Sequence, residues 1–581
     1  MSKNLNSNLS LGAIFLGLSL FFTPNAKAVQ YVWTGSSTGT KGTWATGNWN
    51  VGSSAATVAP GSSDNLLLTK GNALTTTTGG ITLTATTMSI QDITIDNTYA
   101  TIARNLQNDS TTANSTLTLV GGRSEANGNL ISTVSAFSQT IRNSTTTGTY
   151  ALNLVLGSSG NFYVGNSSTL PSSGSVGALK ISSDISETGG ARTITKTGTG
   201  ALFLGSTLAT TKQGAAVAGN TFTGGINLSE GQLGYESKSA FGTGTVTMSA
   251  GTVVGQTAAI GTVDADRTLA NRFVINGNVG FGDSTRTVFL GGDVDLGAGT
   301  RNITLYNSTY FKGVVGNGGL STDASGSATR TLYLSGNNTF AGGTTVNSGG
   351  LVALNTTGSA TGSGDVTVNA GGTVSGSGKI AGTVRGAGLV TAGTTITSAS
   401  AALLQVGQLD TTSGMSFAFE ATSTSFLNSG AYSNDVIRAT ATAGSPFTQA
   451  LTSANVISIY LNAGSLAAYN NENAGVFQTG FFSDSDFSLG SGTFNLFVQA
   501  AGGLTTFQGQ TYQSWADYVA TTGSALNQSF SMGTSAATLA NGDSGFISTL
   551  TITTIPEPST GAMLVFGLVG LVGMRALKRK A

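Results

Sequence analysis

The chain of 581 residues contains no cysteine and no histidine. Without cysteine there is no disulfide framework, no thiol nucleophile and no zinc site built on thiolates. Without histidine, the Ser-His-Asp and Cys-His arrangements of hydrolases are excluded, together with the side chain that most readily titrates near neutral pH. An enzyme built on this sequence would have to use carboxylates, lysine, arginine or tyrosine.

Charge and proline are also scarce. Only 9% of the residues are charged, and 25 lysines and arginines balance 25 aspartates and glutamates, whereas about 25% charged residues is usual. A neutral chain with so few cations lacks the basic surface that nucleic-acid binding requires, so no nucleic-acid partner is expected. The 6 prolines contrast with 84 glycines, but the glycines do not recur at every third position, which excludes collagen.

The N-terminal residues 1–28 are typical of a secretory signal peptide. An apolar run over 9–22 is followed by Ala26 and Ala28, which match the small-residue pattern of a cleavage site. Cleavage after Ala28 would make Val29 the first residue of the mature chain. The alternative is an uncleaved anchor, but the run is short for a membrane span.

Residues 555–581 combine three features in a fixed order. A Pro-Glu-Pro motif comes first, followed by an apolar stretch over 561–577 that predicts a short transmembrane helix. The motif consists of Pro556, Glu557, Pro558 and Ser559, and the basic residues at the end are Arg575, Lys578, Arg579 and Lys580. Because lysine and arginine favour the cytoplasmic side of a membrane, the residues before the motif are expected outside the inner membrane.

This order of features resembles the PEP-CTERM sorting signal. The resemblance implies that an exosortase-type sorting protease recognises the motif and removes the tail, so that insertion into the inner membrane is transient. It also implies a Gram-negative bacterium, a final location on the cell surface or in the extracellular matrix, and exopolysaccharide as a partner. A plain C-terminal tail anchor is the alternative.

Between the two ends, the sequence pattern favours β-strands. Apolar residues alternate with threonine, serine and asparagine, as at 245–248 and 365–368, and glycine-rich turns separate these short segments. We therefore predict an all-β protein whose residues 29–400 form a right-handed parallel β-helix, a solenoid. A series of antiparallel sandwiches is the alternative, although hairpin signals are few.

An internal repeat supports the prediction of a solenoid. The segment 220–225, Asn-Thr-Phe-Thr-Gly-Gly, returns at 338–343 as Asn-Thr-Phe-Ala-Gly-Gly, and the clear copies cover about 194–255 and 330–375. Stacked copies of such a unit can bury a continuous apolar core, and the paired glycines are expected at corners that exclude a side chain. These blocks resemble the autotransporter-associated β-strand repeat.

Residues 401–554 have a different composition. The repeats stop and phenylalanine becomes denser. We expect a small β-rich C-terminal module that caps the solenoid, with a short helix at 515–520 and a single apolar helix in the sorting signal that follows.

The densest charges lie between residues 264 and 301. They are Asp264, Asp266, Arg267, Arg272, Asp283, Arg286, Asp293, Asp295 and Arg301. Enzymes that cleave polysaccharides use carboxylates as acid, base or calcium ligands, and Asp293 and Asp295 would share one face of a strand. Interleaved opposite charges are more often a solvated surface. We therefore predict no catalytic residue, no metal site and no cofactor.

Two further groups of residues have alternative interpretations. The segment Asp484-Ser485-Asp486 is a weaker calcium candidate, for which turn formation is the simpler explanation. Trp33, Trp44 and Trp49 could form a sugar-stacking platform, but we favour an aromatic plug that closes the N-terminal end of the core.

The predicted function is that of a secreted, sorted, non-enzymatic structural or adhesive protein of the cell surface or matrix. The alternative is a β-helix carbohydrate-active enzyme, a lyase or hydrolase, that acts on extracellular polysaccharide.

Overall fold

The structure is a computed structural model of the whole chain. It describes residues 29–33, 42–44, 49–68, 80–83, 87–97, 105–108, 113–121, 128–135, 139–143, 150–165, 178–205, 219–235, 237–254, 268–283, 286–394, 401–423, 427–428, 430–440, 446–461, 475–489, 494–500, 505–507, 510–512 and 528–554. The predicted signal peptide at 1–28, the predicted helix at 515–520 and the sorting signal at 555–581 lie outside these residues.

The described part of the chain is all-β, as predicted. Every regular element in it is a β-strand, so it contains no helix that could cross a membrane. Four larger sheets contain most of the strands, and two further pairs are short hairpins.

The bounds of the strands follow, sheet by sheet. Sheet A comprises β1 (Gln30–Trp33), β3 (Trp49–Val51), β4 (Ser54–Ala55), β5 (Asn65–Leu68), β8 (Asp92–Asn97), β11 (Asn129–Ser135), β14 (Gly160–Gly165), β17 (Ile194–Thr197), β19 (Ile226–Leu228), β21 (Val246–Met248), β23 (Phe273–Ile275), β26 (Val294–Asp295) and β29 (Val315–Gly316). Sheet B comprises β2 (Gly42–Thr43), β6 (Gly80–Leu83), β9 (Asn105–Asn108), β12 (Gln139–Asn143), β15 (Leu179–Ile181), β18 (Ala201–Leu204), β20 (Gln232–Tyr235), β22 (Thr252–Val254), β24 (Val279–Phe281), β27 (Thr300–Leu305), β30 (Gly319–Ala324), β32 (Thr344–Val346), β34 (Val366–Val368), β36 (Lys379–Gly386), β38 (Leu403–Asp410), β42 (Val436–Ala439), β44 (Gly475–Ser483), β48 (Gln528–Thr538) and β49 (Ser544–Thr554). Sheet C comprises β7 (Thr87–Ile90), β10 (Ser115–Leu119), β13 (Leu152–Leu156) and β16 (Asp184–Glu187). Sheet D comprises β25 (Val288–Leu290), β28 (Thr309–Phe311), β31 (Thr331–Leu334), β33 (Gly349–Ala353), β35 (Gly372–Gly376), β37 (Leu389–Thr391), β39 (Ser416–Ala421), β43 (Val456–Leu461) and β45 (Asn495–Ala500). The hairpins are β40 (Leu427–Asn428) with β41 (Ala431–Tyr432), and β46 (Thr505–Phe507) with β47 (Gln510–Tyr512).

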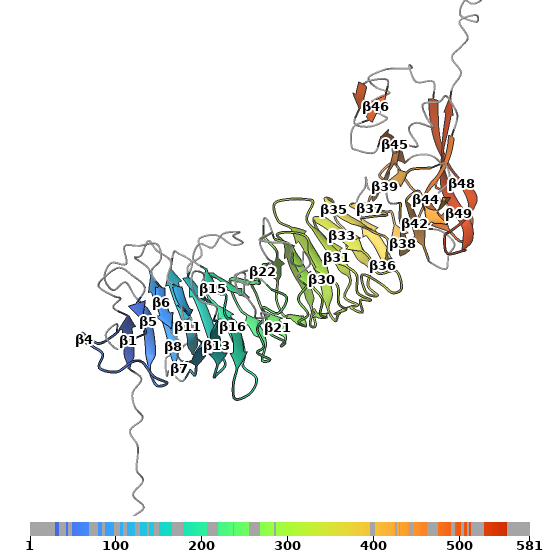
Figure 1. Cartoon of the computed structure of the whole chain (residues 1–581). Coiled ribbons are helices and arrows are strands. Elements are labelled where there is room, and N and C mark those ends of the chain that lie inside the picture. The colour runs from blue at the N-terminus through green and yellow to red at the C-terminus, as the bar shows by residue number, and fades with distance from the viewer. Residues whose placement is uncertain are drawn as a thin grey trace, which may run out of the picture.

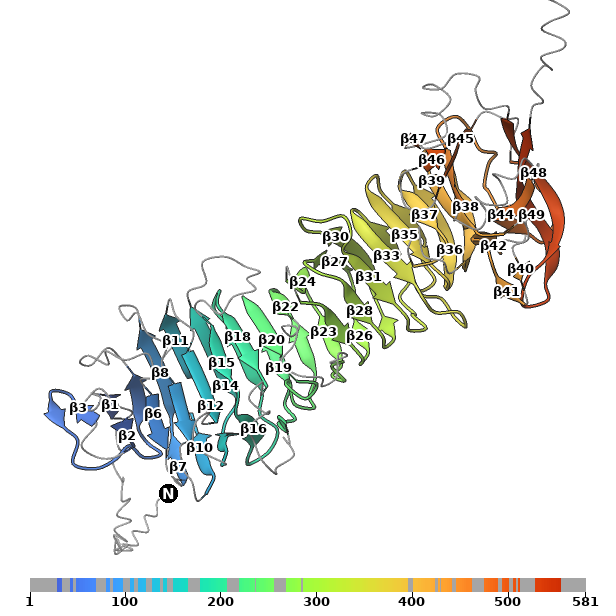
Figure 2. The same ribbon diagram turned by 45° about the horizontal axis from the view of Figure 1, so that its top comes forward.

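From β5 to β16, consecutive strands belong to sheets A, B and C in rotation, and from β23 to β31 they belong to sheets A, B and D in rotation. Strands β5, β6 and β7 lie in sheets A, B and C, and β8, β9 and β10 repeat this order. Within each sheet, a strand pairs in parallel with the strand one rotation earlier, as for Leu66 with Ile93 in sheet A and Ile81 with Leu106 in sheet B. The chain therefore passes through the sheets in turn, and the strands stack along an elongated molecule (Figures 1 and 2).

Sheets C and D lie along the same side of this stack. Backbone N–H groups of Thr221 and Thr243 donate to the carbonyls of Ile185 and Phe222, which extends sheet C by hydrogen-bonded turns. Further along, Leu269 donates to Phe289 in the first strand of sheet D. Sheets B and D then continue across residue 400, because β36 pairs with β38 and β37 pairs with β39.

The core is one long apolar column enclosed by the sheets. Alternate residues of the strands point inward, as in β10 and β13, whose leucines are fully buried while the threonine or asparagine between them is partly exposed. The buried cluster extends from Tyr31 to Leu550. Continuous burial of this kind is what stacked repeat units provide.

Antiparallel pairs of the larger sheets lie at the two ends of the molecule. Strands β1, β3 and β4 pair antiparallel at the N-terminal end of sheet A, and β44, β49 and β48 do so at the C-terminal end of sheet B. The alternative of antiparallel sandwiches is wrong, because the long sheets between these ends are built from parallel pairs. Antiparallel end strands shield the last parallel edge from pairing with another chain.

The paired glycines of the repeat lie at corners, as predicted. Gly225 and Gly343 both have φ of 79°, in the left-handed region that disfavours other residues. At Gly224 and Gly342, a Cβ atom would overlap the backbone of the neighbouring turn, at Arg192 and Gly318 respectively. Each pair therefore requires its first glycine for space and its second for conformation.

Candidate functional site

The described residues of the charged region hold neighbouring turns together. Asp283 is fully buried and Arg286 is 6% exposed; the guanidinium of Arg286 lies 3.5 Å from the carboxylate of Asp283 and over the ring of Phe203, 5.1 Å from its centroid. The backbone N–H of Arg286 also donates to Asp283 at 2.8 Å. This pair closes the connection between β24 and β25, which is a structural role.

Asp293, immediately before β26, and Asp295, its last residue, lie outward on either side of the buried Val294, as the spacing predicts. Asp293 accepts a hydrogen bond from the backbone N–H of Val314, on the next turn, at 2.9 Å. Asp295 accepts hydrogen bonds from Asn317 at 2.8 Å and from Gly297 at 2.9 Å. Each carboxylate therefore has a donor on the adjacent turn.

The surroundings of Asp295 keep its carboxyl group ionised. The hydrogen bonds from Asn317 and Gly297, together with Arg272 at 2.6 Å, lower its pKa. Arg301 donates to the carbonyls of Ile275 and Leu296 instead of pairing with either aspartate. A general acid would need a raised pKa, so Asp295 is unsuited to that role.

Other members of the charged region lie outside the described residues. They are Asp264, Asp266 and Arg267. Among the residues that the structure describes, no three or more acidic side chains gather in a group that could hold a metal ion.

Trp33, Trp44 and Trp49 pack together at the N-terminal end of the core. Trp49 is fully buried. The ring centroids of Trp33 and Trp44 each lie 4.9 Å from the ring centroid of Trp49, and both contacts are edge-to-face. Tyr31 completes the group at 6.5 Å. Because Trp33 and Trp49 are buried, they cannot serve as a sugar-stacking platform, and the packing supports the plug interpretation.

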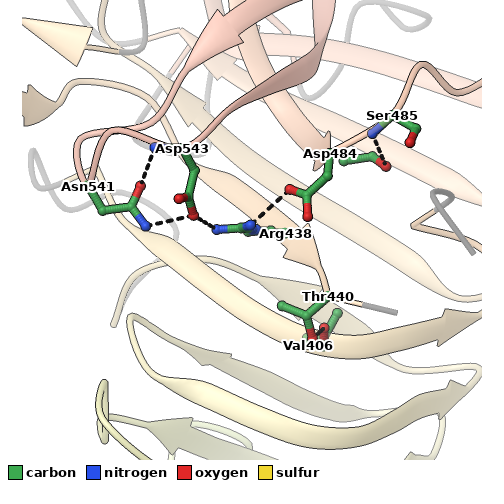
Figure 3. Close-up of polar contacts among 8 residues, drawn as sticks. Val406, Arg438, Thr440, Asp484, Ser485, Asn541 and Asp543 are labelled. Atoms are coloured by element: carbon green, nitrogen blue, oxygen red, sulfur yellow. Dashed lines mark hydrogen bonds and ion pairs between the residues drawn. The ribbon is translucent and has the colours of Figure 1, made fainter. Parts of the chain in front are cut away.

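Asp484 and Asp486 have different partners, so they do not act as a common ligand pair. Asp484 accepts from Arg438 at 2.8 Å, whereas Asp486 accepts from the backbone of Phe487 and from Thr534. Figure 3 shows Arg438 between Asp484 and Asp543, with which it also forms an ion pair. We call Arg438, Asp484 and Asp543 the arginine clasp; it joins β42 to the segment after β44 and to the turn before β49.

An aromatic ladder on the outward face of sheet D was not predicted. The rings of Phe289, Tyr310 and Tyr333 stack on successive strands, with centroids 4.7 Å and then 4.2 Å apart. Lys312 lies 5.1 Å from the centroid of Phe289 and donates to Thr268. Because the rings cover each other's faces, the ladder stabilises the turns and does not offer open faces for stacking a sugar.

Lys196 is a buried cation that the sequence analysis did not single out. Its Nζ lies within 3.1 Å of the backbone carbonyls of Thr197, Gly198 and Glu230, at a corner between two turns. Burial lowers the pKa of Lys196 to about 7, while the negative charge of Glu230 opposes that shift. Its hydrogen bonds satisfy corner carbonyls, which is again a structural role.

Two carboxyl groups are buried beyond residue 400. Asp435 accepts hydrogen bonds from the backbone N–H groups of Ala402 and Glu420, at 3.0 Å and 2.9 Å, and so ties β42 to the start of β38 and to β39. Burial raises the pKa of Asp435 to about 8, and it raises the pKa of Glu420 to about 7. Neither residue could be recognised from the sequence, because both belong to ordinary strand patterns.

The predicted processing residues lie outside the described residues. They are Ala26, Ala28, Pro556, Glu557, Pro558, Ser559, Arg575, Lys578, Arg579 and Lys580. No known family model, curated protein or solved structure matches this chain.

Proposed function

We propose that this protein is an exported, non-enzymatic structural or adhesive rod that is sorted by its C-terminus. The observation that carries the proposal is the order of features at 555–581: the Pro-Glu-Pro motif, the apolar stretch and the basic tail. In this proposal, an exosortase-type protease acts at Pro556–Ser559, insertion of 561–577 into the inner membrane is transient, and the product reaches the cell surface or matrix of a Gram-negative bacterium.

The proposed fold is a right-handed parallel β-helix that starts after a signal peptide ending at Ala28. Its support is the regular passage of the chain through three sets of parallel strands around one apolar core. The two repeat copies resemble the autotransporter-associated β-strand repeat, which implies the same architecture. Such a stack presents a long surface that is built from few types of residue, and this suits a structural or adhesive role.

The placement of the chain ends supports attachment at one end of the rod. Strand β49 ends at Thr554, immediately before the residues of the sorting signal, and lies at the opposite end of the molecule from β1 (Figures 1 and 2). A rod held by its C-terminal signal would therefore extend away from the membrane with its N-terminal end outermost. Exopolysaccharide is the proposed partner along this surface.

The test is a substitution of Pro556-Glu557-Pro558 by three alanines, expressed in the native host. We expect the full-length variant to accumulate in the inner membrane. The control replaces Thr553 and Thr554, just before the motif, by serine, and it should be processed like the parent. Release of the alanine variant to the surface at the parent's level would refute the sorting proposal. A parent protein that keeps its basic tail and stays in the membrane would instead indicate a plain tail anchor.

A further inference from the structure

A cavity of about 330 Å³ lies where the last turns of the repeat region meet the C-terminal strands. Five segments line it: the turn after β33, the corner at the start of β36, the start of β38, the hairpin of β40 and β41, and the turn between β48 and β49. Its volume is at the small end of the range for ligand sites, about 300–1,000 Å³. The cavity therefore has room for one small molecule or for one unit of a larger one.

One cation and two neutral amides supply the polar wall of the cavity. Lys379 is partly exposed there and forms no ion pair among the described residues. Gln405 and Asn541, which carry side-chain amides, and Ser377, which carries a hydroxyl group, also line the cavity. An isolated ammonium beside amides and a hydroxyl suits a ligand that carries one carboxylate and several hydroxyl groups.

The apolar part of the cavity consists of Leu403 and the ring of Tyr432. Leu403 is 8% exposed, and Tyr432 packs beside it in a cluster with Val436 and Phe482. An aromatic ring beside hydrogen-bonding side chains offers contact area for the C–H face of a sugar ring, in keeping with the mixed lining of ligand sites.

Asn541, which lines the cavity, is held by Asp543 of the arginine clasp (Figure 3). Asn541 donates to the carboxylate of Asp543 at 2.9 Å, and its own side-chain oxygen accepts from the backbone N–H of Asp543 at 3.1 Å. The hydrogen bonds from Arg438 and Asn541 lower the pKa of Asp543, so this carboxylate stays ionised and keeps its partners. A side chain that is held in place before binding loses less conformational entropy when a ligand binds.

The floor of the cavity is also held in place. The backbone N–H of Ala402 donates to Asp435, and the carbonyl of Ala402 accepts from Val436 at 2.9 Å. The Gln405 backbone N–H donates to Gly378 at 3.0 Å, which fixes the start of β38 against the corner before Lys379. Both the floor and the walls are therefore tied to strands of sheet B.

We propose that this cavity binds one acidic sugar unit, with the sugar carboxylate on Lys379, its hydroxyl groups on Gln405 and Asn541, and its ring against Tyr432. The inference deepens the proposed contact with polysaccharide and rests on it for the source of the ligand. Binding by the purified chain is independent of sorting, so a failure here and a failure of the sorting proposal are distinguishable.

The test is saturation-transfer NMR on the purified mature chain, residues 29–554, with D-glucuronate, D-glucose and acetate as probes. We expect glucuronate to bind at least ten-fold more tightly than either glucose or acetate, with affinity that falls as salt increases. Lys379→Met should weaken glucuronate binding about ten-fold or more, and Gln405→Ala should weaken it several-fold. The matched control is Lys312→Met, which removes an exposed lysine of the aromatic ladder and should leave binding unchanged.

Several outcomes would overturn the proposal. The first is that the folded parent chain does not bind glucuronate. The second is that the parent and Lys379→Met bind glucuronate equally, and the third is that Lys312→Met loses as much glucuronate affinity as Lys379→Met. Acetate binding as strong as that of glucuronate would show a simple carboxylate site and refute the sugar class, and equal binding of glucose would refute the role of Lys379. Circular dichroism of each variant, compared with the parent, separates loss of binding from loss of fold.

Discussion

At the scale of single residues, asparagine at the corners connects three successive turns. Asn338 is buried; its side-chain oxygen accepts from the backbone N–H of Val315 on one turn at 2.7 Å, and its nitrogen donates to the carbonyl of Ala360 on the next turn at 2.5 Å. Asn220 does the same between Ile185 and Ala240. At a corner the sheet hydrogen bonds are interrupted, so an amide that both donates and accepts replaces them.

The first prediction concerns this amide. Asn338→Ala should lower the free energy of unfolding by about 2–6 kcal/mol, because it leaves one N–H and one carbonyl buried without partners at about 1–3 kcal/mol each. The neighbouring Asn337 is exposed, so Asn337→Ala is the control and should change the value by less than about 0.5 kcal/mol. Urea unfolding followed by circular dichroism measures both, and equal effects would contradict the corner role.

The second prediction separates backbone strain from lack of space at the corner glycines. Gly371 has φ of 89°, and a Cβ atom at this position would have no neighbour within 4 Å, so Gly371→Ala should cost only the left-handed strain, about 1–2 kcal/mol. At Gly225 a Cβ atom would overlap the carbonyl oxygen of Thr245, so Gly225→Ala should cost a further 1–3 kcal/mol or so. Similar urea midpoints for the two variants would argue against the close approach at Gly225.

At the scale of elements, the two repeat copies share local structure but occupy different sheets. The first copy stacks Asn220 on β16 of sheet C and continues into β19 of sheet A and β20 of sheet B. The second stacks Asn338 on β29 of sheet A and continues into β32 of sheet B and β33 of sheet D. Each part of the second copy therefore lies one side further around the stack than the matching part of the first copy.

The length of a turn also varies along the stack. The register of sheet B repeats after 18 residues between Val366 and Val384, but after 44 between Val436 and Gly480. Extra residues between strands cost little, since loop-closure entropy grows only slowly with length. The parallel register can therefore resume after each insertion.

The third prediction concerns pH and the strands that Asp435 and Glu420 join. The pKa of Glu420 is raised to about 7 in the folded protein, so the folded state binds its proton more tightly than the unfolded state. Its contribution to stability is present at low pH and is lost as pH rises from about 4.5 through 7. We expect the parent to lose more stability between pH 5 and pH 8 than Glu420→Gln, by on the order of 2 kcal/mol, since one pKa unit is about 1.4 kcal/mol.

Urea midpoints of both proteins at pH 5 and pH 8 measure this difference. The comparison cancels the pH dependence of groups away from Glu420, including Lys196, whose lowered pKa makes stability rise with pH above about 7. Besides burial, the charge of Glu420 also raises the pKa of Asp435, so the measured difference includes this coupling. An identical pH dependence in parent and variant would show that Glu420 does not titrate as inferred.

Local features of the fold could be predicted from the sequence, and long-range ones could not. Alternation and paired glycines indicated short strands and corners, because these signals act within a few residues. The arginine clasp joins Arg438 to Asp543 across 105 positions, and no local pattern indicates such a contact. The rotation of the repeat also escaped prediction, because it depends on which sheet each strand joins.

The candidate sites illustrate the same limit. The charge density around Asp283 and Asp295 was visible in the sequence, but the partners of Asp295 include residues on neighbouring turns, so its structural role required the register of the sheets. The cavity beside Lys379 combines five segments between residue 356 and residue 541. Only the folded chain brings these segments together.

At the scale of the whole molecule, the stack of parallel strands has different ends. The N-terminal end is closed by Trp49 and its neighbours, and the C-terminal end by the antiparallel strands β44, β49 and β48. Because the proposed sorting signal directly follows β49, export and sorting would leave the closed N-terminal end free.

Intact-mass analysis of the protein recovered from the surface of its native host tests this proposal most directly. Processing at both ends predicts a chain that begins at Val29 and ends between Pro556 and Ser559. A surface-exposed protein that still carries the basic tail from Arg575 to Ala581 would contradict it.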